Sequence, residues 1–405
     1  MSQHWVGFAQ GTPFARRRLE DPIATTPAPV IRAQPLPSLT GLRWLAALVV
    51  FAYHVRNAGL FSGNAQSAMT SVFGAGAIGV SLFFVLSGFV LSWSHKPNQS
   101  ARSFWWHRVA RIYPLHVVAL AAALLLSATV LPQIATGDPW ALFANATLTS
   151  SWNADWWQAG NPVSWSLVCE AFFYLAFPLI IVGVRALSRR ALISAAVSTV
   201  ILVLATSPIV SALLPQISPN SSPIVRLPEF VLGVVLAQLM AKKIWRGPRL
   251  VPALAVAIAG YAAAQSFPDS PLRIASFTIV GFCLLIAALA RADQEGRPTI
   301  LATKPLTTLG TLSFPFYLVH LLIIQSFVAL VPGAYENPSA VVSIVHVIGA
   351  LAIALVAAAL LHRLVENPGR RLLLSRMRPS RTVDPSPVRH PDPSRREQAS
   401  EVPVG

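Results

Sequence analysis

Ten apolar stretches of membrane-spanning length constrain the fold of this chain more than any other feature. A helix rises about 1.5 Å per residue, so roughly 20 apolar residues cross the hydrocarbon core of a bilayer. The stretches lie at about 40–60, 75–94, 114–133, 164–184, 192–214, 224–241, 250–267, 273–290, 306–331 and 341–363. With 54% hydrophobic and 11% charged residues, the chain is too apolar for a soluble protein of 405 residues. We therefore expect an all-α, polytopic integral membrane protein with about ten transmembrane helices.

The basic residues predict how these helices are oriented. If the N-terminus is cytoplasmic, 27 of the 31 Lys and Arg residues fall in cytoplasmic segments. Arg56, Arg226 and Arg273 fall on the outer side, and Arg43 lies within the membrane. Cytoplasmic loops of membrane proteins carry such an excess of positive charge. We expect both termini to be cytoplasmic.

The net charge of +16 does not indicate nucleic-acid binding, because the basic residues are spread over the loops that border the apolar stretches. Anionic lipid headgroups explain this distribution better, so the expected partner of these loops is the lipid bilayer. Cys169 and Cys283 both lie in apolar stretches and are expected to be small buried hydrophobic residues. No metal site is expected.

Three regions follow from the composition along the chain. Residues 1–36 contain three consecutive arginines but no apolar core before Leu39, which predicts a disordered basic cytoplasmic arm rather than a cleaved signal peptide. Residues 37–373 form the ten-helix membrane domain. Residues 374–405 are rich in Pro, Arg and Ser and are expected to be a disordered cytoplasmic tail. The longest outer loop is expected at about 134–163.

Two ionisable residues interrupt the first apolar stretch. Arg43 and His54 lie about 16 Å apart along one helix, so at least one of them is deep in the bilayer. Ionisable side chains at that depth are costly and usually functional. The alternative is an arginine anchored at the interface together with a histidine that a neighbouring helix satisfies.

Depth along the helices places further titratable groups near the level of His54. Glu170, Glu229 and His320 also fall in the outer half of their stretches. A buried carboxylate can fix the tautomer of a histidine and stabilise its protonated form. We expect His54 to be a general base towards a substrate hydroxyl, with Glu170 as the residue that orients it. For Glu229 and His320, a structural hydrogen bond is an equally good explanation.

The residues predicted at the cytoplasmic end of the helices have different chemistry. The segment FWWHRVARIYPLH places Arg108 and Arg111 on one face of a helix, with aromatic residues that include Tyr113 nearby. Guanidinium groups bind phosphate bidentately and aromatic rings stack on purines, so these residues suit a nucleotide-like ligand such as coenzyme A. Arg43 would extend this positive surface towards a thioester. The alternative is that these arginines only anchor the helix at the cytoplasmic interface.

Seven motifs in a fixed order make the chain resemble the membrane-bound acyltransferase-3 family over about 36–373. They are SLTGLRWLAALVVFAYH, GVSLFFVLSGFVLSW, FWWHRVARIYPLH, SWSLVCEAFFYLAFPL, RLPEFVLGVVLA, LGTLSFPFYLVH and LVENPGRRLL. The resemblance implies an acyl-CoA co-substrate and no permanently bound cofactor. It implies essential Arg43 and His54, a functional Glu170, and roles for Arg108 and Arg111 on the donor side. One departure is Pro315, where family members more often carry tyrosine or another non-proline residue.

The resemblance also implies an activity. A short form without an esterase-like domain resembles the branch that tailors antibiotics, so we expect transfer of an acetyl or short acyl group from acyl-CoA to a hydroxyl. The acceptor would be a small-molecule natural product such as a macrolide, or a sugar. One alternative is O-acetylation of a cell-surface polysaccharide or lipid-linked sugar. A proton-coupled transporter and a structural membrane protein are alternatives of other classes. The Ala-, Arg- and Pro-rich composition fits a bacterial plasma-membrane protein.

Overall fold

The computed structural model describes residues 34–96, 99–214, 217–273, 275–331 and 339–376. The helices below all belong to one compact unit, Pro35–Gly405. The arm predicted for 1–36 and the tail predicted for 374–405 lie almost entirely outside the described residues.

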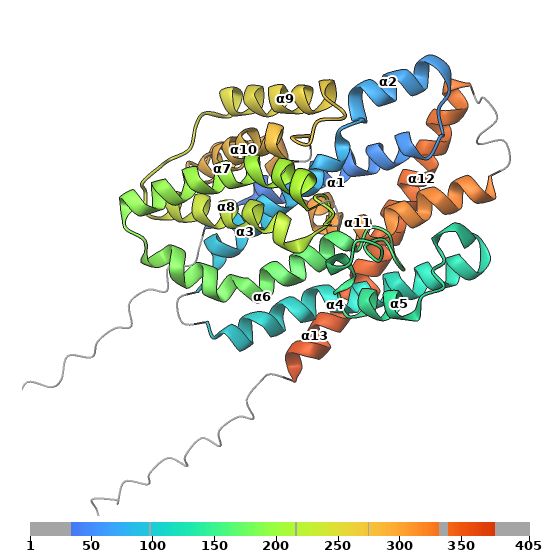
Figure 1. Ribbon diagram of the computed structural model, residues 1–405, viewed down its shortest axis with the longest axis horizontal. Helices are drawn as coiled ribbons and strands as arrows, with labels where there is room; N and C mark the ends of the chain where they lie inside the picture. The colour runs from blue at the N-terminus through green and yellow to red at the C-terminus, as the bar shows by residue number, and fades with distance from the viewer. Residues whose placement is uncertain (1–33, 97–98, 215–216, 274, 332–338, 377–405) are drawn as a thin grey trace, which may run out of the picture. The chain divides into compact units, whose positions relative to one another are not determined.

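Every described regular element is a helix, and each of the ten predicted stretches is largely helical, which confirms the predicted all-α class (Figure 1). Nine helical segments of the described chain are long and apolar enough to cross a membrane, and a shorter apolar helix, α9, is the tenth. The bounds are α1 Pro37–Asn57, α2 Gly63–Phe73, α3 Gly79–Ser94, α4 Ala101–Thr129, α5 Pro139–Ala146, α6 Trp165–Ala186, α7 Arg189–Leu213, α8 Pro223–Ala241, α9 Leu250–Ser266, α10 Ser276–Gln294, α11 Lys304–Leu330, α12 Ala340–Leu361 and α13 Asn367–Ser375. A π-helical turn, η5 (His362–Glu366), joins α12 to α13, and single 3-10 turns precede α3, α5, α6 and α11.

Two predicted boundaries differ from the structure. Helix α4 begins at Ala101 rather than near residue 114, and the Ser100 hydroxyl caps its first turn by accepting from the Ser103 amide at 3.2 Å. The expected outer loop at 134–163 contains the short helix α5, whose start Asp138 caps by accepting from the Trp140 amide at 2.8 Å. Capping side chains satisfy amides that the first helical turn leaves without partners.

Helices α3 and α8 cross at very close range in the middle of the bundle (Figure 1). A Cβ atom on Gly88 would overlap the carbonyl oxygen of Phe230, and one on Gly233 would overlap the carbonyl oxygen of Val85. The two glycines therefore let each backbone pack directly against the other, as small residues do between membrane helices.

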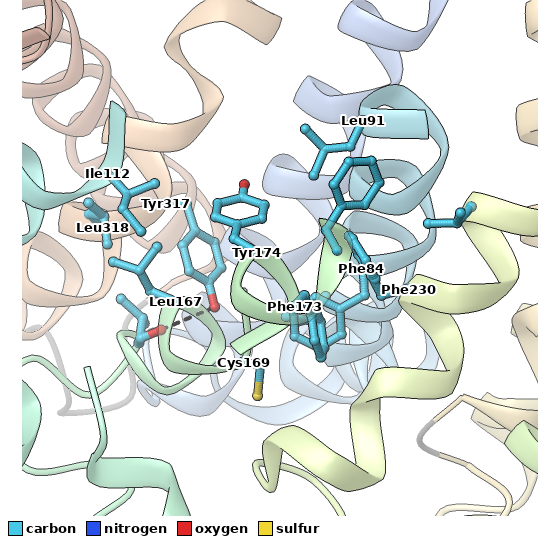
Figure 2. Packing of buried hydrophobic residues seen from close by; sticks show 14 of the residues in the cluster. Phe84, Leu91, Ile112, Leu167, Cys169, Phe173, Tyr174, Phe230, Tyr317 and Leu318 are labelled. Carbon is cyan, nitrogen blue, oxygen red and sulfur yellow. Dashed lines mark hydrogen bonds between the residues drawn. The ribbon is translucent and has the colours of Figure 1, made fainter. Parts of the chain in front are cut away.

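Aromatic side chains fill the space beside this crossing. Figure 2 shows Phe84, Phe173 and Phe230 grouped together. The ring centroids of Phe84 and Phe173 are 5.1 Å apart, and those of Phe173 and Phe230 are 5.0 Å apart. Cys169 and Cys283 are both buried and free, as predicted. This packing holds α8 against α3 and α6, and the latter two helices supply many of the residues of the candidate site.

Candidate active site

A cavity of about 100 Å³ gathers three of the predicted arginines. We call it the arginine cavity; its charged and hydrogen-bonding lining residues are Arg43, Ser87, Arg108, Arg111, Ser166, Glu170, Tyr174, Ser313 and Tyr317. Helix α1 contributes Arg43, α4 contributes Arg108 and Arg111, and α6 contributes Glu170. With three cations to one carboxylate, the lining suits an anionic ligand.

Glu170 is held within this cavity by two hydroxyl groups. The Tyr174 hydroxyl, one helical turn further along α6, donates to Glu170 Oε1, and the Ser87 hydroxyl of α3 donates to the same oxygen at 3.1 Å. Arg43 is close enough to interact electrostatically with both Glu170 and Tyr174. The carboxylate thus faces the arginines of its own cavity.

Arg108 lies between two aromatic rings. Its guanidinium carbon is 5.5 Å from the ring centroid of Phe104 and 5.8 Å from that of Tyr174. Its Nε is buried and has no hydrogen-bond partner among the described residues. A buried donor of this kind is rarely left unsatisfied, so it is available to an oxygen of a ligand.

Tyr113 does not join these residues. Its side chain is 40% exposed, it does not line the arginine cavity, and its ring is 6.2 Å from that of His116. Residues two positions apart on a helix point in different directions, which is why Tyr113 does not follow Arg111 into the cavity.

A second, larger cavity of about 880 Å³ contains His54. We call it the His54 cavity; its charged, amide and aromatic lining residues are Tyr53, His54, Asn57, Gln133, Asp155, Trp157, Gln158, Trp165, Asn220, Arg226, Arg273, Tyr317 and Gln325. Many of them belong to the loops that join the helices at one end of the bundle. Its volume is that of a site for a drug-sized ligand.

The structure does not bring Glu170 to His54. The two residues line different cavities, and the ring nearest to His54 on another helix is that of His320, with centroids 5.1 Å apart. Glu229 lines neither cavity, but it forms a buried ion pair at 3.0 Å with Arg226, which lines the His54 cavity. Arg226 also donates to the Ser81 hydroxyl at 2.8 Å. Of the four groups predicted at one depth, only His54 and His320 are neighbours.

Val80 and Tyr317 line both cavities and separate them. The Tyr317 hydroxyl accepts from the Ser166 hydroxyl at 2.8 Å and donates to the Val163 carbonyl at 3.3 Å. Ser166 lines the arginine cavity and Val163 lines the His54 cavity, so this hydroxyl is bonded to both sides of the partition. Figure 2 shows the hydroxyl groups of Tyr317 and Tyr174 pointing in opposite directions.

Sequence reasoning missed Tyr174 and Tyr317. A helical pattern was available for both, because Tyr174 follows Glu170 by four residues and His320 follows Tyr317 by three. Residues at these spacings share one face of a helix.

Comparison with known proteins identifies the class of this protein. Residues 36–363 match the acyltransferase-3 family, which is described as an acyltransferase domain. Acyltransferase MdmB of Streptomyces mycarofaciens is 40% identical over 379 residues, which cover 89% of this chain and 96% of that protein. O-acetyltransferase OatA of Staphylococcus aureus is 27% identical over 367 residues, 83% of this chain but 57% of that longer protein. Peptidoglycan O-acetyltransferase OatA of Listeria monocytogenes is 29% identical over 163 residues, 35% of this chain and 24% of that protein. No solved structure matches the chain.

The matched region includes every residue that lines the two cavities. The match favours an acyltransferase over a transporter or a structural protein as the class of this protein. The chain belongs to the acyltransferase-3 family and is a membrane-embedded O-acyltransferase.

Proposed function

We propose that this enzyme moves an acetyl or other short acyl group from acyl-CoA to a hydroxyl of a small-molecule natural product such as a macrolide, or of a sugar. The observation that carries this proposal is the pair of adjoining cavities, one lined by three arginines and the other by His54. A phosphate-bearing donor and a neutral, drug-sized acceptor need two sites of this kind.

The donor belongs to the arginine cavity. At about 100 Å³ it is smaller than the roughly 300 to 1,000 Å³ of ordinary ligand pockets. It therefore suits the slender arm of coenzyme A, with the nucleotide remaining outside. Arg108 and Arg111 would hold phosphate oxygens at its mouth, and Arg43 would lie further along towards the thioester. In this scheme Glu170 and Tyr174 hold the arginines in place.

The acceptor belongs to the His54 cavity. As the acceptor oxygen attacks the thioester carbonyl, His54 takes the hydroxyl proton. The C–S bond then breaks, the ester forms, and the imidazolium returns the proton to the departing thiolate. The products are the acylated acceptor and free coenzyme A. Tyr317 and Val80 lie between the cavities, where the acyl group must pass.

The distribution of basic residues orients this reaction in the membrane. We infer that both termini are cytoplasmic in a bacterial plasma membrane, because 27 of the 31 Lys and Arg residues then face the cytoplasm. The donor would enter from the cytoplasmic end, and the loops around the His54 cavity would lie at the outer end.

A second acceptor class is a cell-surface glycan. The similarity to the peptidoglycan O-acetyltransferase of Listeria monocytogenes favours it, although that match covers only 35% of this chain. The match to MdmB covers nearly the whole of both proteins at higher identity, whereas the longer OatA of Staphylococcus aureus is covered to only 57%. Because this short form resembles the antibiotic-tailoring branch of the family, we place the small-molecule acceptor first.

Purified protein incubated with radiolabelled acetyl- or propionyl-CoA tests the proposal. With a glycosylated macrolide present, we expect free coenzyme A and a product heavier by one acyl group in mass spectrometry. A panel of sugars and glycan fragments run in parallel distinguishes the second acceptor class. If a folded, monodisperse preparation acylates none of these hydroxyl acceptors, the proposal is wrong.

A further inference from the structure

His320 is a buried histidine that the proposed reaction does not yet use. It lies on α11 with no exposed surface, and its Nδ1 is 2.7 Å from the Tyr317 carbonyl oxygen. A carbonyl oxygen can only accept, so Nδ1 carries the proton. In the neutral ring, Nε2 is then a hydrogen-bond acceptor.

This acceptor has no partner. Nε2 of His320 is fully buried and unbonded within the described part of the chain. A buried polar atom without a hydrogen bond costs about 1 to 3 kcal/mol, so its presence calls for an explanation.

Among the aromatic rings of other helices that contact His320 in the described chain, only that of His54 carries a polar atom. The rings of Phe51 and Phe316 lie 6.4 Å and 5.8 Å away and cannot donate a conventional hydrogen bond. The His54 ring on α1 is closer, at 5.1 Å between centroids. At this separation, facing ring nitrogens come within hydrogen-bond distance after a small rotation of His54, which borders the open space of its cavity.

The geometry points to His320 as the residue that positions His54. A ring N–H of His54 would donate to Nε2 of His320, and the other nitrogen of His54 would then hold its lone pair towards the cavity. The same bond would stabilise His54 when it carries the acceptor's proton. His320 would thus perform the part that a carboxylate performs in other histidine-dependent sites. This inference rests on the proposed role of His54 as the base.

Two substitutions separate this role from structural support. His320→Asn keeps a donor for the Tyr317 carbonyl but is too short to reach His54. His320→Gln can extend an acceptor oxygen towards His54 but loses the hydrogen bond that Nδ1 donates to the Tyr317 carbonyl. A positioning role predicts that the Gln variant retains more activity than the Asn variant, whereas a structural role predicts the reverse order.

We expect His320→Asn to lower kcat by about 10²-fold, with the KM values for acetyl-CoA and for a glycosylated macrolide little changed. If the macrolide is not an acceptor, the kcat for hydrolysis of acetyl-CoA, measured as release of free coenzyme A, is compared among the same variants instead. His116→Asn is the matched control. His116 is equally buried, has one nitrogen 2.8 Å from the Asn145 carbonyl and the other unpartnered, and lines neither cavity. This control should keep its kcat.

A double-mutant cycle with His54→Ala completes the test. If His320 acts only through His54, adding His320→Asn to His54→Ala causes no further loss of kcat. A further loss, a normal kcat in folded His320→Asn, or an Asn variant more active than the Gln variant would overturn the inference. Normal kcat in His54→Ala would instead remove the base from the proposed function, so the two failures are distinguishable.

Discussion

Arg108 illustrates how one side chain can serve both the orientation of a helix and the binding of a ligand. Its charge would fix the cytoplasmic end of α4. Its buried Nε, which has no hydrogen-bond partner in the described part of the chain, and its place between two rings suit a bound oxygen. A substitution that keeps the charge but removes the planar guanidinium separates these roles.

We expect Arg108→Lys and Arg111→Lys to insert normally but to raise the KM for acyl-CoA about tenfold or more. Loss of one charge-assisted hydrogen bond, at about 1.5 kcal/mol, accounts for a change of this size. The KM for the acceptor should change little. Arg102→Lys is the control, because Arg102 is an exposed residue of the same helix that lines neither cavity. A parental KM in both variants would show that these arginines serve only as anchors.

At the scale of helices, α1 connects the two cavities along one of its faces. Arg43 and His54 are separated by eleven residues, which is close to three full turns, so both side chains leave the helix in nearly the same direction. One helix therefore presents Arg43 to the arginine cavity and His54 to the His54 cavity. Any shift of α1 against its neighbours would displace both residues together.

The α3–α8 crossing makes a prediction about stability. Gly233→Ala places a methyl group against the Val85 carbonyl, so the two helices must separate, at a cost of about 1 to 3 kcal/mol. Gly183→Ala in α6 is the control, because nothing lies within 4 Å of that position and alanine is the better helix former. Thermal unfolding in detergent should show a lower midpoint for the first variant and an equal or higher midpoint for the second. Equal midpoints for Gly233→Ala and the parent would contradict the close crossing.

The ten helices could be predicted from hydropathy, but the start of α4 could not. Its first turns contain His107, Arg108 and Arg111, which lower the hydropathy that marks a membrane segment, although they continue the same helix. Helix α5 was missed because it is only eight residues long, despite the capping signal of Asp138 followed by proline.

The arrangement of the candidate site could also be predicted only in part from the sequence. Counting residues along a helix gives the depth of a side chain but not the direction in which it points or the helix that faces it. Depth alone paired His54 with Glu170, whereas the structure places Glu170 beside Ser87 of α3 and His54 beside His320 of α11. The directions could be known only after the helices were packed.

For the whole molecule, Val80 and Tyr317 lie between the two cavities, so under the proposed function they would keep the donor apart from water in the larger cavity. Tyr317→Ala removes the ring and its two hydrogen bonds, so water gains access to the thioester. We expect this variant to release coenzyme A from acetyl-CoA at least several-fold faster than the parent in the absence of acceptor. Tyr113→Ala, which alters an exposed tyrosine outside both cavities, serves as the control. An unchanged rate of thioester hydrolysis would show that the partition does not protect the donor.

The same two side chains also have an electrical consequence. If the two cavities open towards opposite sides of the membrane, Val80 and Tyr317 are part of the barrier to ions across which the cell maintains its proton-motive force. Natural variation that widened this point to admit a bulkier acyl group would then also open a path for protons and ions. The size of the acyl groups that such an enzyme can accept is then limited in two ways: by the fit of the substrate and by the leakage of protons and ions that the cell can tolerate.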